Sequence, residues 1–335
     1  MLLKRVSFVA LAAMLGLAMV VGGCAQIDQD TLVFADAGWD SIRFHNDIAA
    51  FIIEHGYGYS TEVMAGSTPL TFTSLREGSI HIYMETWQET FQDTYNEAIE
   101  SGDILEISVN YDDARGGFYV PTFVIEGDPE RGIEPMAPDL RRVDQLHDYW
   151  ELFLDPEDSS KGRIIGSPPG WEVDIIMAGK VEGYGLDEYY NYFSPGSDTA
   201  LSTALLTAYE QGKPIVGYYW EPTWLMGLYD FTFLEEDEHD PEKFAEDYTT
   251  MILARPVTVT VHKDLPDIAP DVVEFLSNYQ TSTAITNEAL AYMHENNVSS
   301  YEAALWFLEE YEDVWIQWVP EDVAEKVKQA LAEER

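Results

Sequence analysis

Short apolar runs alternate with helix-like stretches over the first part of the chain, and this alternation constrains the fold more than any other feature. "TLVFADAGW" (31–39) and "IHIYMETW" (80–87) have the composition of buried strands. "DSIRFHNDIAAFIIEHGYG" (40–58) and "LTFTSLREGSI" (70–80) have the apolar spacing of helices, and Gly56 is typical of a helix end. Such a β-α-β-α-β succession predicts a parallel sheet covered by helices, an open α/β lobe.

The alternation continues along the chain and predicts a second lobe. Further strands are expected at 118–125, at 162–171 where the strand runs into a Pro-Gly turn, at 214–220 and at 251–263. Helices are expected at 140–153, 172–185, 199–212 and through most of the C-terminal remainder. We therefore predict an α/β fold of two lobes, each a mostly parallel sheet flanked by helices, with a cleft between them. The lobes are expected to comprise residues 31–120 with 255–335, and residues 121–254; a single larger sheet is the alternative.

Residues 1–23 have the composition of an export signal. The basic start "MLLKR" precedes an apolar run that ends in "VGGC", and this run is short for the roughly 20 residues of a membrane-spanning helix. A cysteine after two glycines at this boundary resembles the lipobox of bacterial lipoproteins, so Cys24 is expected to be lipidated and residues 24–30 to form a tether to the membrane. Cys24 is the only cysteine, which leaves no disulfide partner. A plain signal peptide or an uncleaved anchor is the alternative.

The chain carries a large excess of acidic residues. It has 61 Asp and Glu against 18 Lys and Arg, a formal net charge of −43. A surface of this sign repels phosphate backbones, so nucleic acid is not expected as a partner. The composition does not indicate disorder, because 46% of the residues are hydrophobic and 13% are aromatic. A saline habitat would account for this acidity.

Sequence motifs for catalysis, metals and cofactors are absent. The chain has no G-x-S-x-G, no H-E-x-x-H, no EF-hand loop and no Walker A motif. Its seven histidines are scattered without metal-ligand spacing. We therefore expect no metal, no cofactor and no enzymatic activity. The alternatives from other classes are a carbohydrate-active enzyme with aromatic subsites and two carboxylates, and a structural lipoprotein.

Four of the nine tryptophans occupy positions where a predicted strand gives way to a loop or helix. They are Trp39 in "ADAGWDS", Trp87 in "YMETWQE", Trp171 in "SPPGWEV" and Trp220 in "YYWEPTW". Ligands of open α/β sheets bind at the carboxyl ends of strands, so the four indoles are expected to converge from both lobes. Each of them alone is more simply explained by core packing. Within "GYYWEPTWLMG", Tyr218 and Trp224 are assigned to packing and Trp220 to a ligand.

Converging indole faces predict a ligand that carries a positive charge but no N–H groups. An aromatic face attracts a cation within about 6 Å, and a box of rings can surround the methyl groups of a quaternary ammonium. If the ligand also carries a carboxylate, the helix after "GSPPGW" supplies an anion site. The backbone amides of Trp171, Glu172 and Val173 at its N-terminus would be free to donate. The alternative is that "PPG" is only a turn.

Together, the lipobox, "ADAGWDS", "ETWQE", "GSPPGWEV" and "GYYWEPTW" resemble the glycine betaine/proline betaine-binding proteins of ABC importers, in order and over nearly the whole chain after the signal. The resemblance implies a type II periplasmic-binding-protein fold whose lobes close over the solute. It also implies a cage for the trimethylammonium group formed by Trp87, Trp171 and Trp220, with the amides after "PGW" on the carboxylate. Similarity to choline-binding relatives adds Trp39 and either Phe118 or Tyr119.

One position departs from this resemblance. Many betaine-binding relatives have a histidine a few residues after the position of Trp87, where this chain has Phe91. The helix amides could act alone, Arg43 or His45 could replace the histidine, or the ligand could lack a carboxylate. Both Arg43 and His45 are more simply explained as exposed residues of a solvated helix face. Asp40 could meet a choline hydroxyl, but we favour a role as the cap of its helix.

The resemblance thus implies an extracytoplasmic, lipid-anchored receptor that captures a small quaternary ammonium solute and hands it to an ABC permease. Glycine betaine is the favoured ligand, and a choline- or carnitine-type receptor of the same fold is the alternative.

Overall fold

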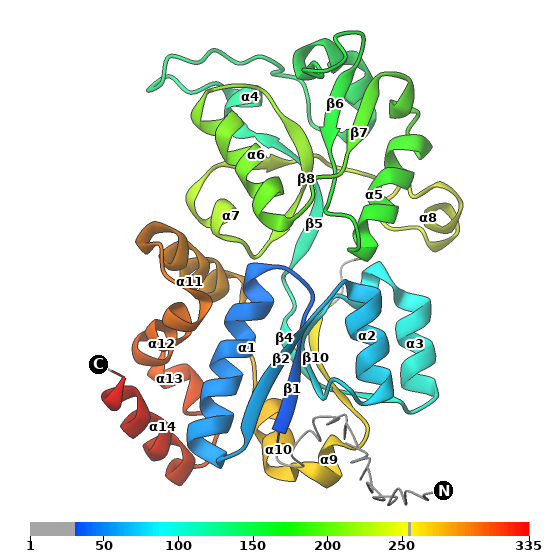
Figure 1. Cartoon of the computed structure of the whole chain (residues 1–335). Coiled ribbons are helices and arrows are strands. Elements are labelled where there is room, and N and C mark those ends of the chain that lie inside the picture. The colour runs from blue at the N-terminus through cyan, green and yellow to red at the C-terminus, as the bar shows by residue number, and fades with distance from the viewer. Residues whose placement is uncertain (1–30, 254–255, 335) are drawn as a thin grey trace, which may run out of the picture.

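The computed structural model describes residues 31–253 and 256–334, which form two five-stranded sheets flanked by helices (Figure 1). The predicted α/β class with two lobes is confirmed. The first sheet has the order β2-β1-β3-β10-β4 and the second β7-β6-β8-β5-β9. The predicted signal, Cys24 and the tether lie outside the described residues, as does the predicted lobe boundary at 254–255.

The strands of the first sheet are β1 (Thr31–Asp36), β2 (Ser60–Ala65), β3 (Ile82–Thr86), β4 (Ile104–Tyr111) and β10 (Val257–His262). Those of the second sheet are β5 (Arg115–Pro121), β6 (Gly162–Ile165), β7 (Tyr190–Phe193), β8 (Val216–Glu221) and β9 (Phe231–Phe233).

Each sheet is mixed, where the sequence predicted mostly parallel strands. In the first sheet β1 pairs in parallel with β2 and β3, whereas β10 is antiparallel to β3 and β4. In the second sheet β6 is parallel to β7 and β8, whereas β5 is antiparallel to β8 and β9. Parallel neighbours need a crossover connection. The antiparallel pairs involve β5 and β10, the strands that enter each sheet from the other one.

The helices of the first lobe are α1 (Asp40–Ile52), α2 (Thr68–Glu77), α3 (Gln92–Glu100), α9 (Leu265–Ile268), α10 (Pro270–Asn278), α11 (Thr283–Asn296), α12 (Ser300–Glu310), α13 (Glu312–Trp315) and α14 (Glu321–Glu333) (Figure 1). Those of the second lobe are α4 (Thr122–Glu126), α5 (Glu172–Gly183), α6 (Asp198–Glu210), α7 (Trp224–Leu228) and α8 (Pro241–Asp247). A π-helical turn, Ile53–Tyr57, extends α1.

The chain passes from the first sheet to the second between β4 and β5. The boundary predicted at residue 120 is therefore too late, because β5 pairs with β8 and β9 and is part of the second sheet. The strand predicted at 118–125 ends at Pro121, and residues 122–126 form α4. Proline has no N–H with which to extend a ladder, which fits a strand end at this position.

Two other sequence predictions need correction. The long strand expected at 251–263 is confined to β10, which begins directly after Pro256, again where a proline interrupts the ladder. The helix expected at 140–153 is two short 3-10 helices, Val143–Asp148 and Trp150–Phe153.

Central strands bury both faces and position the ends that carry the candidate site. Every residue of β3 and β10 is buried, as are five of the six residues of β1. The edge strand β2 is mostly exposed, so its sequence lacks the apolar run that would have predicted it. Trp39 and Trp87 follow the buried strands β1 and β3, so a rigid core determines where their side chains begin.

Candidate functional site

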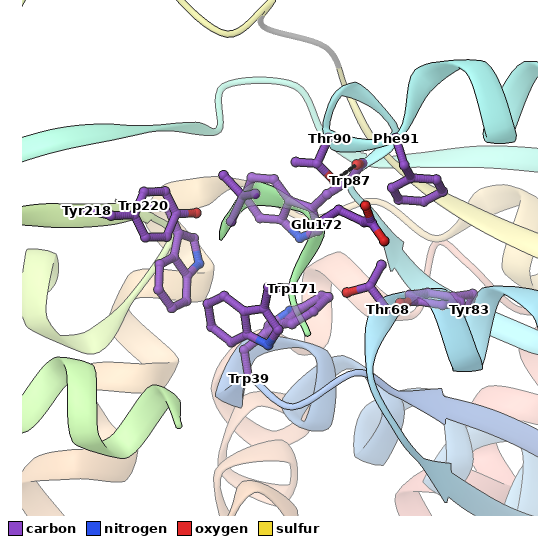
Figure 2. Close-up of a pocket in the computed structure, with 11 residues that line it drawn as sticks. Trp39, Thr68, Tyr83, Trp87, Thr90, Phe91, Trp171, Glu172, Tyr218 and Trp220 are labelled. Carbon is purple, nitrogen blue, oxygen red and sulfur yellow. Dashed lines mark hydrogen bonds between the residues drawn. The ribbon is translucent and has the colours of Figure 1, made fainter. Parts of the chain in front are cut away.

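One cavity between the two sheets gathers Trp39, Trp87, Trp171 and Trp220, the four tryptophans selected from the sequence (Figure 2). Its lining residues are Trp39, Thr68, Tyr83, Trp87, Thr90, Phe91, Trp171, Glu172, Val173, Tyr218 and Trp220. Those numbered below 100 come from the first lobe and the others from the second. The site is therefore complete only when the two lobes face each other.

The indole rings meet nearly at right angles. The ring centroids of Trp171 and Trp39 are 5.5 Å apart with an interplanar angle of 85°, and those of Trp171 and Trp220 are 5.1 Å apart at 83°. Tyr218 stacks on Trp220 with centroids 5.8 Å apart at 18°. Perpendicular rings act as adjacent walls of a box, so the cavity presents several aromatic faces to one volume.

Local backbone geometry places the tryptophans at the cavity. Gly38 has a φ of 108°, a conformation that favours glycine, and the chain turns there from β1 toward α1. Gly170 has a φ of 94° in the turn before α5, so that Trp171 becomes the N-cap residue of this helix. Substituting either glycine would strain the turn that positions the following indole.

Glu85, which the sequence analysis missed, anchors two of the tryptophans. The Nε1 atoms of Trp39 and Trp87 both donate to Oε2 of Glu85, at 2.6 and 3.2 Å. Glu85 is fully buried, and this burial raises its pKa to about 7. A sequence signal existed, because buried indole N–H groups need acceptors and Glu85 lies only two residues before Trp87.

The other end of the cavity is polar. The hydroxyl groups of Thr68 and Tyr83 lie on the same side as the carboxylate of Glu172, as Figure 2 shows. The first amides of a helix have no intrahelical acceptor, so those of Glu172 and Val173 at the start of α5 are available to a ligand. The amide of Trp171, predicted to be free, instead donates to the carbonyl oxygen of Pro168 at 3.3 Å. None of the described lining residues is basic.

Phe118 and Tyr119, expected in the cage from the resemblance, do not line the cavity. Both are buried in β5. Because β5 runs antiparallel to β8, Gly116 is the residue opposite Trp220, and a Cβ there would lie 3.4 Å from the Tyr218 hydroxyl oxygen. Tyr218, assigned to packing from the sequence, is the aromatic residue of this sheet that joins Trp220 in the lining.

The polar candidates on α1 also lie away from the cavity lining. Arg43 Nε contacts Asp36 Oδ2 at 3.0 Å, and its Nη1 contacts Asp40 Oδ1 at 3.3 Å. Asp40 is the first residue of α1 and not its cap, since Trp39 occupies the N-cap position. His45, expected to be exposed, is fully buried and its Nδ1 lies 2.8 Å from the Tyr279 hydroxyl oxygen. Arg43 and His45 are absent from the cavity lining, so neither can take the place of the histidine that many betaine-binding relatives have. Phe91, which occupies the position of that histidine, lines the cavity.

Two kinds of feature are absent from the described residues. Within residues 31–253 and 256–334, no group of three or more His, Cys, Asp or Glu is arranged to hold a metal ion. Over the same part of the chain, no helix has the length and apolar character needed to cross a membrane.

Sequence similarity to known proteins extends over most of the chain. The family model for the substrate-binding domain of ABC-type glycine betaine transport systems matches residues 30–310. The trimethylamine N-oxide-binding protein of Pelagibacter ubique is 22% identical over 284 residues, which are 82% of this chain and 88% of that protein.

Solved structures share the fold. An ABC-transporter choline-binding protein in complex with choline matches with a TM-score of 0.71 at 22% identity, over 90% of this chain and 98% of that one. Lactococcal OpuAC, in its closed conformation with glycine betaine, matches with a TM-score of 0.65 at 18% identity, over 87% and 99% of the two chains.

Two α/β lobes with an aromatic cavity between them define a two-lobed solute-binding protein. Such a protein encloses a small molecule where strand ends from both lobes meet. The chain belongs to the family of substrate-binding domains of ABC-type glycine betaine transport systems.

Proposed function

We propose that this protein captures a small quaternary ammonium solute in the tryptophan-lined cavity and delivers it to an ABC permease. The observation that carries the proposal is the near-perpendicular arrangement of Trp39, Trp171 and Trp220 around one cavity. Trp87 and Tyr218 add further rings to the same volume. A trimethylammonium group can contact several of these faces at once.

The energetics favour a cation without N–H groups. Each desolvated cation–π contact contributes roughly 2 kcal/mol, and several rings act on the same charge. A primary ammonium would instead need hydrogen-bond acceptors at the cavity. Behind the aromatic walls, Glu85 Oε2 already accepts hydrogen bonds from Trp39, Trp87 and Ser41, so it is not free to accept from an ammonium held between the rings.

Glycine betaine is one ligand that the polar end could hold. The amides of Glu172 and Val173 and the hydroxyl groups of Thr68 and Tyr83 would donate to its carboxylate. Choline is a second candidate, favoured by the carboxylate of Glu172 at the same end and by the absence of a basic residue among the described lining residues. Its hydroxyl group would donate to Glu172, whereas a ligand carboxylate would be repelled.

We also propose that the protein is held at the membrane by a lipid anchor, a location that the N-terminal sequence supports. Lipidation at Cys24 would hold the protein at the outer face of the cell membrane, with the two lobes closing over the solute before it reaches the permease. Replacing Cys24 with serine should move the protein from the membrane fraction of the producing cells to the soluble fraction. Retention of the Cys24→Ser variant in the membrane would contradict a lipid anchor at this residue.

Calorimetric titration tests the proposed ligand class. The panel consists of glycine betaine, proline betaine, choline, carnitine, trimethylamine N-oxide and dimethylsulfoniopropionate, with glycine and ethanolamine as matched compounds that lack the methyl groups. We expect one-to-one binding of at least one methylated onium compound and none of the matched compounds. Failure of every methylated compound to bind would reject the proposal.

A further inference from the structure

Glu85 lies in β3 outside the cavity lining and holds two of its walls. Its Oε2 atom accepts hydrogen bonds from the Nε1 atoms of Trp39, at 2.6 Å, and Trp87, at 3.2 Å. The hydroxyl group of Ser41 donates to the same oxygen at 3.0 Å. A single carboxylate thereby orients two rings that follow different strands.

The surroundings of Glu85 leave its charge uncompensated. The titratable side chains that face it are His45, Tyr83, Tyr111 and Tyr279. His45 Nε2 lies 3.5 Å from Oε1 of Glu85, but burial lowers the pKa of His45 to about 3, so the imidazole is neutral near pH 7. Burial raises the pKa of the three tyrosines, which keeps them neutral as well. Among the described residues, no lysine or arginine lies within ion-pair distance of Glu85.

We propose that Glu85 is a positioning residue and the fixed counter-charge of the cage, through which the site distinguishes a cationic head group from an uncharged one of the same shape. The inference rests on the proposed function and extends it. The rings of Trp39 and Trp87 provide the contact surface, and the carboxylate behind them provides the charge.

Two physical effects connect Glu85 to the ligand. A carboxylate that accepts an indole N–H polarises the ring toward higher electron density, which strengthens the attraction of its face for a cation. In addition, the charges of Glu85 and the ligand attract each other across a buried region, where the effective dielectric constant is well below that of water. A neutral tert-butyl group of the same size would gain from neither effect.

Proton linkage follows from the same arrangement. Burial raises the pKa of Glu85 to about 7, and a bound cation favours the ionised carboxylate and lowers this pKa again. Cation binding near pH 7 should therefore release about half a proton. The affinity for the cation should rise as the pH increases from 5.5 to 8, because less of Glu85 remains to be deprotonated.

The test compares wild-type protein with Glu85→Gln, using choline and glycine betaine. Each is paired with its uncharged-head isostere, 3,3-dimethylbutan-1-ol for choline and 3,3-dimethylbutanoate for glycine betaine, measured by competition. We expect Glu85→Gln to weaken binding of the cationic ligand at least tenfold and to change binding of the isostere less than twofold. Calorimetry in two buffers of different ionisation enthalpy should find proton release in the wild type and none in the variant. Glu100→Gln, which removes an exposed carboxylate on α3, should behave as the wild type.

The outcomes separate this inference from the proposed function. If the wild type binds no methylated onium compound, including choline and glycine betaine, the proposed function fails. If the wild type binds but Glu85→Gln weakens the cation and the isostere equally, Glu85 only supports the fold of the cage and the counter-charge is refuted. If Glu85→Gln does not fold, the wild type alone decides: cation binding without proton release and with a pH-independent affinity would overturn the inference.

Discussion

Trp171 lies between two other indoles, and its position makes it the residue on which the cavity most depends. It contacts Trp39 of the first lobe and Trp220 of the second with near-perpendicular rings. It is also the N-cap residue of α5, and the two residues that follow it, Glu172 and Val173, line the cavity as well. One residue thus adjoins both the aromatic and the polar parts of the site.

Replacing Trp171 with alanine should weaken binding of the preferred onium ligand by more than tenfold, since one desolvated cation–π contact contributes roughly 2 kcal/mol. Isothermal titration calorimetry measures the change directly. Trp306→Ala serves as the matched control, because Trp306 stacks on Tyr292 in the helical part of the first lobe, away from the cavity lining. An unchanged affinity in Trp171→Ala would remove this residue from the cage.

Glu172 should determine which onium compound is preferred. Glu172→Gln keeps the backbone amide at the start of α5 but removes the negative charge from the polar end of the cavity. We expect the affinity for glycine betaine to rise several-fold, because the ligand carboxylate loses a repulsive neighbour. The affinity for choline should fall several-fold, because the choline hydroxyl group loses a charged acceptor. Competition titrations of the two ligands give the ratio. A ratio unchanged by the substitution would contradict contact between Glu172 and the ligand's polar end.

At the scale of elements, α5 must be held rigidly for its N-terminus to form part of the cavity. Lys180 on α5 is fully buried, and its Nζ donates to Oε1 of Glu236 at 2.6 Å and to the carbonyl oxygens of Tyr248 and Thr250. These contacts join α5 to both ends of the segment 236–250, which contains α8. The run "LEEDEHD" (234–240) has the composition of a solvated acidic loop, and the buried lysine that secures this segment has no sequence signal of its own.

Lys180→Met should reduce the free energy of unfolding by about 3 kcal/mol, because it leaves the Glu236 carboxylate buried without its partner. Urea unfolding followed by circular dichroism measures this loss. Lys213→Met, which removes an exposed lysine next to α6, should change the free energy of unfolding by less than about 0.5 kcal/mol. Equal stabilities of the two variants would show that the buried ion pair does not hold α5 in place.

At the scale of the whole molecule, the sequence allowed the α/β class and the convergence of the four tryptophans to be predicted, because strand ends can be recognised from apolar runs. The sequence did not allow us to predict which side chains of neighbouring strands face the cavity. The resemblance implies a cage position for Phe118 or Tyr119, and the sequence predicts packing for Tyr218, whereas the antiparallel register of β5 and β8 puts Gly116 opposite Trp220. Glu85 was missed because its importance depends on Trp39, 46 positions away along the chain.

Closure of the two lobes is the movement that the cavity requires. Trp39 and Trp220 are only 6% and 5% exposed, so a solute reaches their faces only when the lobes separate. Small-angle X-ray scattering should therefore record a smaller radius of gyration with saturating ligand than without it. Trp171→Ala should not become compact at the same ligand concentration. A wild-type radius of gyration that is insensitive to saturating ligand would contradict a binding mechanism based on closure.

A crystal structure of the protein with its bound onium ligand tests the central claim most directly. We predict that the quaternary nitrogen lies within about 6 Å of the ring centroids of Trp39, Trp87, Trp171 and Trp220. The polar group of the ligand should point toward Thr68 and the start of α5. A ligand bound elsewhere, or bound in this cavity with its methylated head group at the polar end, would contradict the account.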